Sequence, residues 1–350
     1  MSAAPATIDA VCRQVGASRG PLRVAGAATK RRPVDDAAPV LALTGLSGIV
    51  AYDPAECVVT ALGGTPAAVI DAALAGHGQY LPFDPPLADE GATLGGVIAS
   101  GWSGPSRYRY GGVRDFLIGA RVVDGRGRLI VSGGQVVKNA AGFLTHHALV
   151  GSAGRLGVIV EASLKVFPRP EARATVVARA PSIEAAVAAH ERVRLANLDL
   201  DALDLDAAAL TVAVRLAGAS EVLARRVARA TQALGLDGGV LTGAADAEVW
   251  AAPAVLTAPV VAKIPAAPSR LLEVLHTVAP FGPARTSVGG ALVFVAPGDG
   301  LGALSAALAG RGWRGVVVRG ARAGDALGAP QDSVFAARVR QALDPDARFA

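Results

Sequence analysis

The chain has 350 residues, of which 52% are hydrophobic and 4% aromatic, and its formal net charge is +5. This length predicts two domains of roughly 150 residues each, and the apolar fraction excludes a disordered or fibrous protein. The basic residues are scattered with few aromatic side chains between them, which argues against a nucleic-acid-binding surface.

Cysteine content and the N-terminus narrow the class of protein further. Cys12 and Cys57 are too few for a disulfide framework or a metal cluster. The N-terminus lacks the basic start and apolar run of a signal peptide, and no apolar stretch reaches the ~18–20 residues of a membrane span. We therefore expect a cytoplasmic protein without a metal site or a transmembrane segment.

The first half of the chain predicts short strands, two helices and one long irregular segment. Runs of β-branched residues bounded by Gly, Pro or Asp predict strands, and Thr65-Pro66 predicts a helix start with Thr65 as the N-cap. The two runs around Gly125-Arg126-Gly127 predict a β-hairpin. Strands are expected at residues 22–25, 41–43, 49–51, 57–60, 117–124, 129–132, 156–160 and 162–166, and helices within residues 1–20 and at 67–75.

Two further features divide this half from the rest. The segment from Pro82 to Gly112 has no regular hydrophobic period, and a loop of this length in a compact domain usually binds a ligand. The sequence Phe167-Pro168-Arg169-Pro170 is the expected domain boundary. We therefore expect one domain over residues 1–170 and a second over residues 171–350.

In the second half, strands and helices alternate. This pattern predicts an antiparallel sheet with helices on one face, which is an α+β cap domain. Strands are expected at residues 175–179, 211–216, 260–264, 291–296 and 315–319, and helices at 182–196, 220–235, 268–278, 300–311 and 333–343.

Two glycine-rich segments share one kind of chemistry. The first reads Ala25-Gly26-Ala27-Ala28-Thr29-Lys30, and the second runs from Thr93-Leu94-Gly95-Gly96 to Ser100-Gly101. Small side chains let backbone N–H groups approach anionic oxygens, while Thr29 and Lys30 add a hydroxyl and a charge. Each segment alone also fits an ordinary turn, but the pair predicts two loops that close on the diphosphate of a dinucleotide such as FAD. Neither a Rossmann fingerprint nor a P-loop is present.

A third segment, Gly133 to Phe143, contains Lys138 and Asn139. Beside a flavin, the Lys138 ammonium would stabilise the anionic reduced ring. The alternative is a lysine whose stem packs against apolar neighbours while its head reaches water. The sequence leaves both interpretations open.

Specific motifs lie between residues 82 and 168. They include Pro82-Phe83-Asp84-Pro85-Pro86, Lys138-Asn139-Ala140-Ala141-Gly142-Phe143 and Gly154-Arg155-Leu156-Gly157-Val158-Ile159. These motifs resemble the FAD-binding domain of the PCMH-type (vanillyl-alcohol oxidase) flavoproteins, in particular the FAD-binding E subunits of bacterial glycolate oxidases. The likeness covers residues 20–170 well and the second half loosely. It implies a PCMH-type two-subdomain FAD-binding fold followed by a smaller α+β cap domain with an antiparallel sheet.

The resemblance also implies site residues. Gly26 to Thr29 and Thr93 to Gly96 would hold the pyrophosphate, Ser100 and Gly101 would lie along the flavin and ribityl chain, Gly157 to Ile159 would contact the adenosine end, and Pro85 would border the isoalloxazine. The first loop has no His or Cys, so non-covalent FAD is implied. The expected cofactor-binding residues are Ala25, Gly26, Ala27, Ala28, Thr29, Lys30, Pro85, Thr93, Leu94, Gly95, Gly96, Ser100, Gly101, Lys138, Asn139, Gly157, Val158 and Ile159.

The chain departs from this family's pattern at one carboxylate and at its histidines. Phe143-Leu144 stand where relatives often have Tyr-Asp. Related 2-hydroxyacid dehydrogenases hold a metal through a His-x-His and further His or Glu, whereas only His190 and His276 follow residue 170 here. Adjacent side chains on a helix diverge, so His146-His147 are expected to be solvated or capping residues. A self-contained hydroxyacid-oxidising site is not expected, and the catalytic residues are unknown.

The resemblance implies the FAD-binding subunit of a glycolate (2-hydroxyacid) dehydrogenase complex, an FAD-dependent oxidoreductase acting on CH-OH donors. A partner FAD-containing dehydrogenase subunit would oxidise glycolate or D-lactate, and an iron–sulfur subunit would accept the electrons, because this chain has too few cysteines for a cluster. The complex would also offer a peripheral attachment to the inner membrane. Two alternatives stay open: a stand-alone FAD-dependent oxidoreductase in which Lys138 and Arg107 bind a small anionic substrate, and a flavin-free scaffold subunit.

Overall fold

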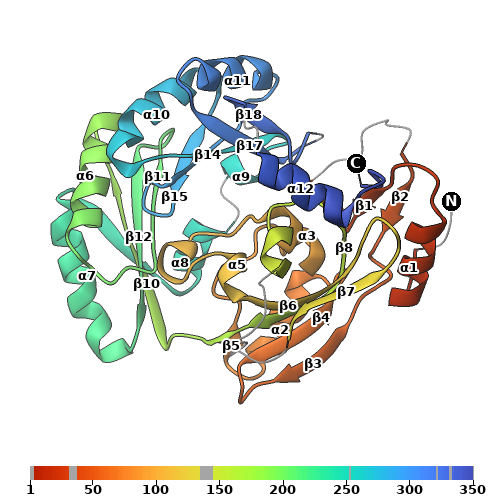
Figure 1. Cartoon of the computed structure of the whole chain (residues 1–350). Helices are drawn as coiled ribbons and strands as arrows, with labels where there is room; N and C mark the ends of the chain where they lie inside the picture. The colour runs from red at the N-terminus through yellow and green to blue at the C-terminus, as the bar shows by residue number, and fades with distance from the viewer. Residues whose placement is uncertain are drawn as a thin grey trace. The chain divides into compact units, whose positions relative to one another are not determined.

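The computed structural model describes residues 4–30, 38–134, 145–251, 254–320, 322–330 and 333–349, apart from the side chains of Ala254 and Phe335. The chain divides into two compact units, whose elements are labelled in Figure 1. The N-terminal unit comprises residues 1–103, 112–168 and 331–350, and the second unit comprises residues 104–111 and 169–330. Within the described ranges, no helix is long and apolar enough to cross a membrane.

The N-terminal unit is built on a five-stranded antiparallel sheet in the order β3-β4-β8-β6-β7. Its strands are β3 (Ile49–Asp53), β4 (Val58–Leu62), β6 (Leu117–Val123), β7 (Leu129–Gly133) and β8 (Val158–Lys165). Two short pairs accompany it: β1 (Arg23–Ala25) lies parallel to β2 (Val40–Ala42), and β5 (Gln79–Tyr80) lies antiparallel to β9 (Phe167–Pro168).

The helices of this unit are short, and the longest ones lie near the chain ends. They are α1 (Ile8–Ala17), α2 (Ala67–Ala75), α3 (Leu94–Ser100), α5 (Val113–Phe116), the 3₁₀ helix η1 (Thr145–Leu149) and α12 (Val334–Leu343). Helix α1 begins at the N-cap Thr7 and buries Val11 and Val15 in a core shared with Val158 of β8. Phe349 enters the same core, so the two ends of the chain complete one unit.

The second unit is a nine-stranded antiparallel sheet covered by helices. In sheet order the strands are β13 (Gly238–Thr242), β10 (Ala172–Arg179), β12 (Thr211–Gly218), β11 (Ala202–Asp206), β15 (Ala284–Ser287), β16 (Leu292–Val295), β14 (Val261–Pro265), β17 (Arg314–Arg319) and β18 (Ala326–Gly328). The helices are α4 (Arg107–Tyr110), α6 (Ile183–Leu195), α7 (Ser220–Leu234), α8 (Gly243–Trp250), α9 (Ala254–Thr257), α10 (Leu271–Val278) and α11 (Leu301–Ala309), with η2 (Pro268–Arg270) and η3 (Ala279–Phe281) flanking α10.

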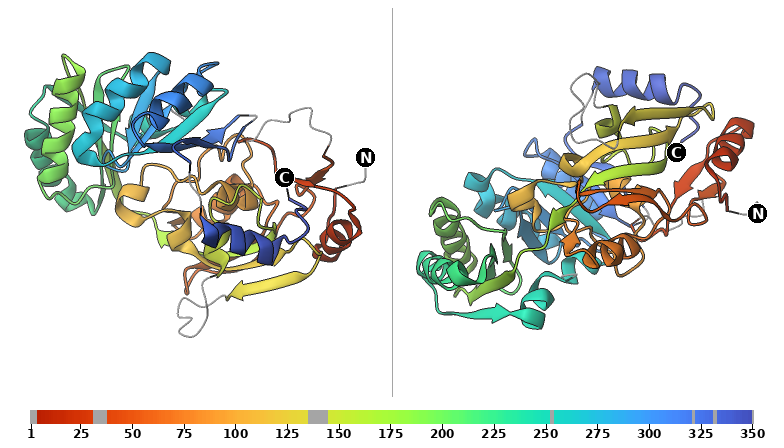
Figure 2. Two further views of the ribbon diagram at one scale, coloured as in Figure 1. Left: turned by 45° about the horizontal axis from the view of Figure 1, so that its top comes forward. Right: turned by 90° about the horizontal axis from the view of Figure 1, so that it is seen from below.

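The two faces of this sheet differ in chemistry. Alternate strand residues such as Val176, Val214 and Val293 form one core with α6, α7, α10 and α11, whose ribbons lie side by side in Figure 2. The opposite face carries Ala202 and Ala213 against Trp250 of α8, together with several charged side chains. This second face is therefore where polar chemistry in the unit is concentrated.

Most elements agree with the sequence predictions. The hairpin around Gly125–Gly127, the helix at 67–75 and all five predicted C-terminal helices are confirmed within a few residues. The α+β class with an antiparallel second sheet is confirmed as well. The sequence did not predict the strands β5, β9, β11, β13, β15 and β18 or the short helices α4, α5, α8 and α9.

Three expectations differ from the structure. Thr65 is not an N-cap, because its hydroxyl is held by both backbone groups of Gly48, at 2.9 and 3.1 Å. The second glycine-rich loop contains helix α3, which the glycines concealed. The division at Pro168–Arg169 lies beside the expected boundary at residue 170, but residues 331–350 pair with the N-terminal unit and residues 104–111 with the second unit.

We predict that Asp344→Ala destabilises the N-terminal unit. The buried Asp344 carboxylate accepts hydrogen bonds from the amides of Arg348 (2.6 Å) and Phe349 (2.9 Å), which fixes the returning C-terminus. Loss of two charge-assisted hydrogen bonds should lower the free energy of unfolding by about 2 kcal/mol, measured by urea denaturation. The exposed Asp346→Ala is the matched control and should change stability little; equal effects of the two variants would contradict the prediction.

Candidate functional site

The first glycine-rich loop leaves β1 and turns with its amides unused. Among the described residues, the backbone N–H groups of residues 26–29 make no hydrogen bond to the protein. Ala28 has a φ of 55°, so the backbone alternates hand within the loop. Successive N–H groups in such a turn point into one concavity, which is the arrangement of an anion-binding nest.

The second segment meets this loop directly. Thr93 caps α3 by accepting a hydrogen bond from Gly96 N–H (3.4 Å). A Cβ added to Gly26 would overlap the Thr93 hydroxyl, so the two predicted segments lie in contact. Alanine in place of Gly26 would push the loop and the start of α3 apart.

A third segment, Gly63 to Thr65, lies beneath α3 and was not anticipated from the sequence. Gly95 donates to Gly63 O (2.8 Å) and Leu94 donates to Thr65 O (2.9 Å). A Cβ on Gly63 would overlap Ile159 O, and one on Gly95 would lie 3.0 Å from Gly63 O. The available signal was the pair Gly63-Gly64 at the end of β4, which only a close backbone approach explains.

Strand β8 and the turn before it form the remaining side. Gly63 donates to Val160 O (2.8 Å), which places Gly157, Val158 and Ile159 next to the glycine contact. Ala153 donates to Ala99 O (2.8 Å), and Gly151 donates to Ile98 O (3.1 Å). The turn at 151–154 therefore attaches to α3, close to its last residues.

Helix α3 ends at its C-cap Gly101, which has a φ of 58°. A Cβ added to Gly101 would lie 3.0 Å from the Cα and N atoms of Gly151, so the two backbones are in close contact. The Ser100 hydroxyl donates to Val97 O (3.0 Å), one turn back in the helix. Thus Ala25 to Thr29, Thr93 to Gly101 and Gly157 to Ile159 are brought together around one glycine-lined backbone surface, which we call the glycine cradle.

Lys30 has a structural contact that the sequence did not suggest. Its side chain is buried and donates to Pro86 O (3.4 Å), so it ties the first loop to the turn that contains Pro85. Lys138 and Asn139, together with Phe143 and Leu144, lie outside the described residues.

Two of the histidines, His146 and His190, are buried. The prediction of solvated histidines is wrong for His146, which is 1% exposed and accepts or donates through Nδ1 to Ser132 Oγ (2.9 Å). Burial lowers the pKa of His146, and the neighbouring His147 lowers it further. Burial lowers the pKa of His190 to about 4, so it is a neutral core residue. Among the described residues, no three His, Cys, Asp or Glu side chains are grouped to hold a metal ion.

The second face of the nine-stranded sheet carries two buried ion pairs and one lysine that forms no ion pair with a described residue. Arg215 is paired with Asp201 (3.0 Å) and Arg285 with Asp204 (3.1 Å), all four buried. Lys263 stands across Phe294 from Arg285 in the strand register, but within the described ranges it has no carboxylate partner.

Lys263 is also near a second cation. Burial, together with the nearby Arg107 guanidinium, lowers the pKa of Lys263 to about 8. Arg107 likewise has no ion pair to any described residue. Two neighbouring cations without a counter-ion favour binding of a small anion, and Lys263 was not anticipated from the sequence.

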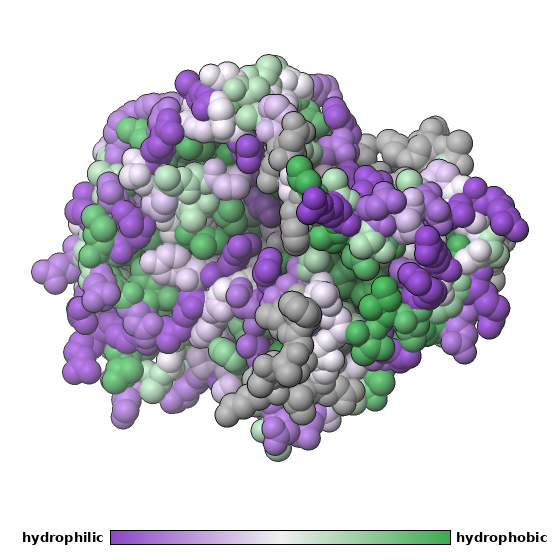
Figure 3. Space-filling model, in the orientation of Figure 1, coloured by the Kyte–Doolittle hydropathy of each residue, from purple (hydrophilic) through white to green (hydrophobic). Residues whose placement is uncertain are grey.

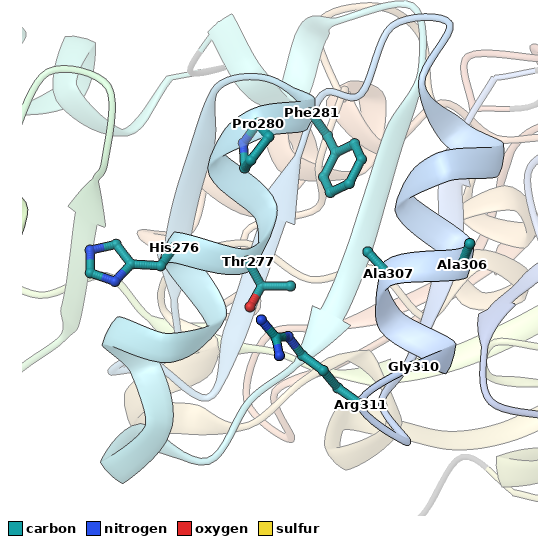
Figure 4. A pocket seen from close by; sticks show the side chains of 8 residues that line it. All are labelled: His276, Thr277, Pro280, Phe281, Ala306, Ala307, Gly310 and Arg311. Atoms are coloured by element: carbon teal, nitrogen blue, oxygen red, sulfur yellow. The ribbon is translucent and has the colours of Figure 1, made fainter.

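A separate hollow of about 420 Å³ lies on the helical side of the second unit, between α10 and α11. Figure 4 shows Phe281 between the two helices and Arg311 reaching from the end of α11 toward Thr277. At its rim His276 Nε2 lies 3.3 Å from Glu184 Oε1. The hollow lacks unused backbone amides of the kind found in the glycine cradle, so it carries no cofactor assignment.

Two of the three segments of the cradle, Ala25 to Thr29 and Thr93 to Gly101, lie in the part of the chain that matches a known family. Residues 3–133 match the family model described as "FAD binding domain". Over these residues the chain is similar to FAD-binding domains. The assignment fits the structure, because a diphosphate needs the unused amides of residues 26–29 and a backbone surface that any Cβ would obstruct.

The chain is also similar to subunits of glycolate oxidases. Glycolate oxidase subunit GlcE of Escherichia coli K12 is 51% identical over 125 residues, which are 36% of this chain and 36% of that protein. Glycolate oxidase subunit GlcD of Bacillus subtilis 168 is 33% identical over 147 residues, or 42% of this chain and 31% of that protein. The similarity therefore spans about a third of the length of each relative.

A solved structure of alkyldihydroxyacetonephosphate synthase has a TM-score of 0.71 at 17% identity and covers 99% of this chain and 74% of its own. At this identity the likeness shows the fold. The expected PCMH-type α+β fold is confirmed, and FAD is the cofactor that the domain supports.

We predict that Gly26→Ala weakens FAD binding about tenfold, because the new Cβ overlaps the Thr93 hydroxyl and opens the cradle. Binding is measured by the quenching of FAD fluorescence on titration with protein. Gly20→Ala is the matched control, since nothing lies within 4 Å of a Cβ at Gly20. Unchanged affinity in Gly26→Ala, with normal folding, would contradict the overlap argument.

Proposed function

We propose that this chain is the FAD-binding subunit of a glycolate (2-hydroxyacid) dehydrogenase complex that passes on electrons from the oxidation of glycolate or D-lactate. The glycine cradle carries this proposal, because two of its three segments lie in the residues that match FAD-binding domains and the chain is 51% identical over 125 residues to a glycolate oxidase subunit. When bound, FAD supplies the two-electron redox chemistry. The residues of this chain bind and orient it.

We assign the cofactor contacts as the sequence analysis did. Residues 26–29 and 93–96 hold the pyrophosphate, Ser100 and Gly101 lie along the ribityl chain, Pro85 borders the ring system, and residues 157–159 contact the adenosine end. FAD is held non-covalently, since residues 25–30 and 93–101 contain no His or Cys. Ala25, Lys30, Lys138 and Asn139 complete the proposed set.

A partner subunit with its own FAD removes hydride from the hydroxyacid in this proposal, and an iron–sulfur subunit accepts the electrons. The small number of His and Cys residues supports this division of labour, as do the core position of His190 and the surface ion pair of His276. The complex resides in the cytoplasm and attaches to the inner membrane through its partners.

An edge strand with exposed apolar side chains supports assembly with a partner. Strand β7 is the last strand of its sheet, and Leu129 and Val131 on it are 37% and 67% exposed. Figure 3 shows hydrophobic side chains gathered over the part of the N-terminal unit where β7 runs. Apolar edge strands left uncovered are prone to pair with other chains.

The test is an absorption spectrum of the purified chain, recorded alone and together with the products of neighbouring genes, with the released chromophore identified after acid precipitation. The proposal expects an FAD spectrum from the single chain that glycolate bleaches only in the complex. No flavin in either preparation, even after reconstitution with FAD, would overturn the cofactor assignment and leave a scaffold subunit.

One observation favours a second candidate function, a stand-alone FAD-dependent oxidoreductase acting on a small anionic substrate. The cation pair Lys263 and Arg107 has no counter-ion among the described residues, and it would bind a carboxylate without help from another subunit. Bleaching of the flavin by glycolate in the single chain would favour this candidate.

If the cation pair binds a carboxylate, affinity should fall as the pH rises through about 8, where Lys263 loses its charge. Above that pH we expect about a tenfold loss per unit, because only the charged form binds. The affinity for glycolate is measured by titration calorimetry between about pH 6.5 and 9.5, a range that brackets the Lys263 pKa of about 8.

Lys263→Arg should keep the affinity at high pH, since arginine stays charged, and Lys263→Met should bind weakly at every pH. The same pH dependence in Lys263→Met as in the unmodified chain would remove Lys263 from the anion site.

A further inference from the structure

Residues 104–111 form a loop that starts and ends in the N-terminal unit but belongs to the second unit. The base of the loop is closed by a hydrogen bond from Val113 N–H to Ser103 Oγ (3.0 Å), both in the N-terminal unit. The loop is therefore fixed at its base by one unit, and what fixes its tip decides whether the two units act independently.

The tip is held by a closed triangle of polar groups in the second unit. Ser106 is fully buried; its hydroxyl donates to Asp201 Oδ2 (3.3 Å) and accepts from Arg215 Nη2. Arg215 Nε in turn donates to the same Asp201 oxygen (3.0 Å). Arg215 also lies over the Trp250 ring, 4.9 Å from its centre. We call Ser106, Asp201 and Arg215 the loop clamp.

Two neighbours of Ser106 add weaker attachments. Arg109 is paired with Asp199, which Arg226 also contacts at 3.1 Å. The Tyr108 ring lies where a Cβ on Gly289 would stand, so it packs directly on that backbone. Three residues of a short loop thus bind the second unit, while Arg107 between them is left near Lys263.

A buried ion pair is a weak source of stability, because desolvation offsets most of the attraction. An apolar pair of similar size would serve folding as well. What the charged pair adds here is direction, since the carboxylate and guanidinium fix the Ser106 hydroxyl in one place. The clamp therefore defines the position of the loop tip rather than the stability of the sheet.

The other end of the loop leads into the glycine cradle. Ser103 follows Gly101, the C-cap of α3, whose N–H donates to Ile98 O (3.0 Å) and Val97 O (3.2 Å). Gly101 packs on Gly151, which is tied to α3 as well. Displacement of the loop would therefore act on the last turn of α3 through only two intervening residues of chain.

We propose that Ser106 is a positioning residue, and that the loop clamp couples FAD retention in the N-terminal unit to the intact second unit. The inference rests on the FAD site and goes beyond the subunit role. It predicts that a hydroxyl which touches no cofactor sets the affinity for FAD, and that the second unit contributes to that affinity through residues 104–111.

The test compares Ser106→Ala with Arg285→Met in the full chain. Ser106→Ala removes the clamp hydroxyl and leaves the Arg215–Asp201 pair in place. Arg285→Met breaks an equally buried pair on the same sheet face, with Asp204 at 3.1 Å and Trp250 at 5.6 Å, but Arg285 makes no hydrogen bond to residues 104–111 in the described structure. Two readouts are used: FAD affinity by fluorescence titration, and hydrogen exchange of the amides in α3.

For Ser106→Ala we expect FAD binding weaker by about five- to fiftyfold, which lies within the range typical of coupling between sites, and faster exchange at Val97 to Gly101. For Arg285→Met we expect lower stability of the second unit with both readouts unchanged. Equal FAD affinity and equal exchange in Ser106→Ala and the unmodified chain would overturn the proposal.

The exchange measurement needs no flavin, so it separates the two hypotheses. If the unmodified chain binds no FAD, the cofactor assignment fails while the mechanical coupling is still measured at α3. If the unmodified chain binds FAD and Ser106→Ala matches it in both readouts, only the coupling fails.

Discussion

The approach of three backbone segments at Gly63 is the contact on which the cofactor site depends. Gly63 donates to Val160 O (2.8 Å) and accepts from Gly95 N–H (2.8 Å), so strand β8 and helix α3 are joined through one residue that has no side chain. A methyl group there would overlap Ile159 O. Because the contact fixes the start of α3, it also fixes the position of Thr93 against Gly26, and hence the opening that an anion would enter.

Sequence patterns foresaw the elements whose stability is local. Helices α6, α7 and α12 alternate apolar and polar faces, so periodicity located them. Helix α3 could not be found this way, because glycine disfavours helix by about 1 kcal/mol per residue relative to alanine. Its formation depends on contacts with Gly63 and Thr65 that are distant in sequence. The two glycine-rich segments were recognisable from composition, but their contact and the third segment at Gly63 required the fold.

The charged face of the second sheet was hidden for a different reason. Arg215, Asp204 and Arg285 lie on β12, β11 and β15, and Asp201 directly precedes β11, so their pairing follows only from strand register. Register also distinguishes Lys263, which faces the same side and has no carboxylate partner among the described residues. A strand residue's chemistry is decided by its neighbours across the sheet, and a single sequence does not specify which strands those are.

The return of residues 331–350 to the N-terminal unit has a consequence for synthesis. Leu22 donates to Arg348 O, Gly125 donates to Leu343 O (2.9 Å), and Phe349 fills the core beside α1. On the ribosome, the core of the N-terminal unit therefore cannot be completed until Phe349 has left the exit tunnel, whereas residues 169–330 of the second unit emerge earlier. Removing Phe349 would thus leave the core of the N-terminal unit incomplete, and this core would be exposed to chaperones.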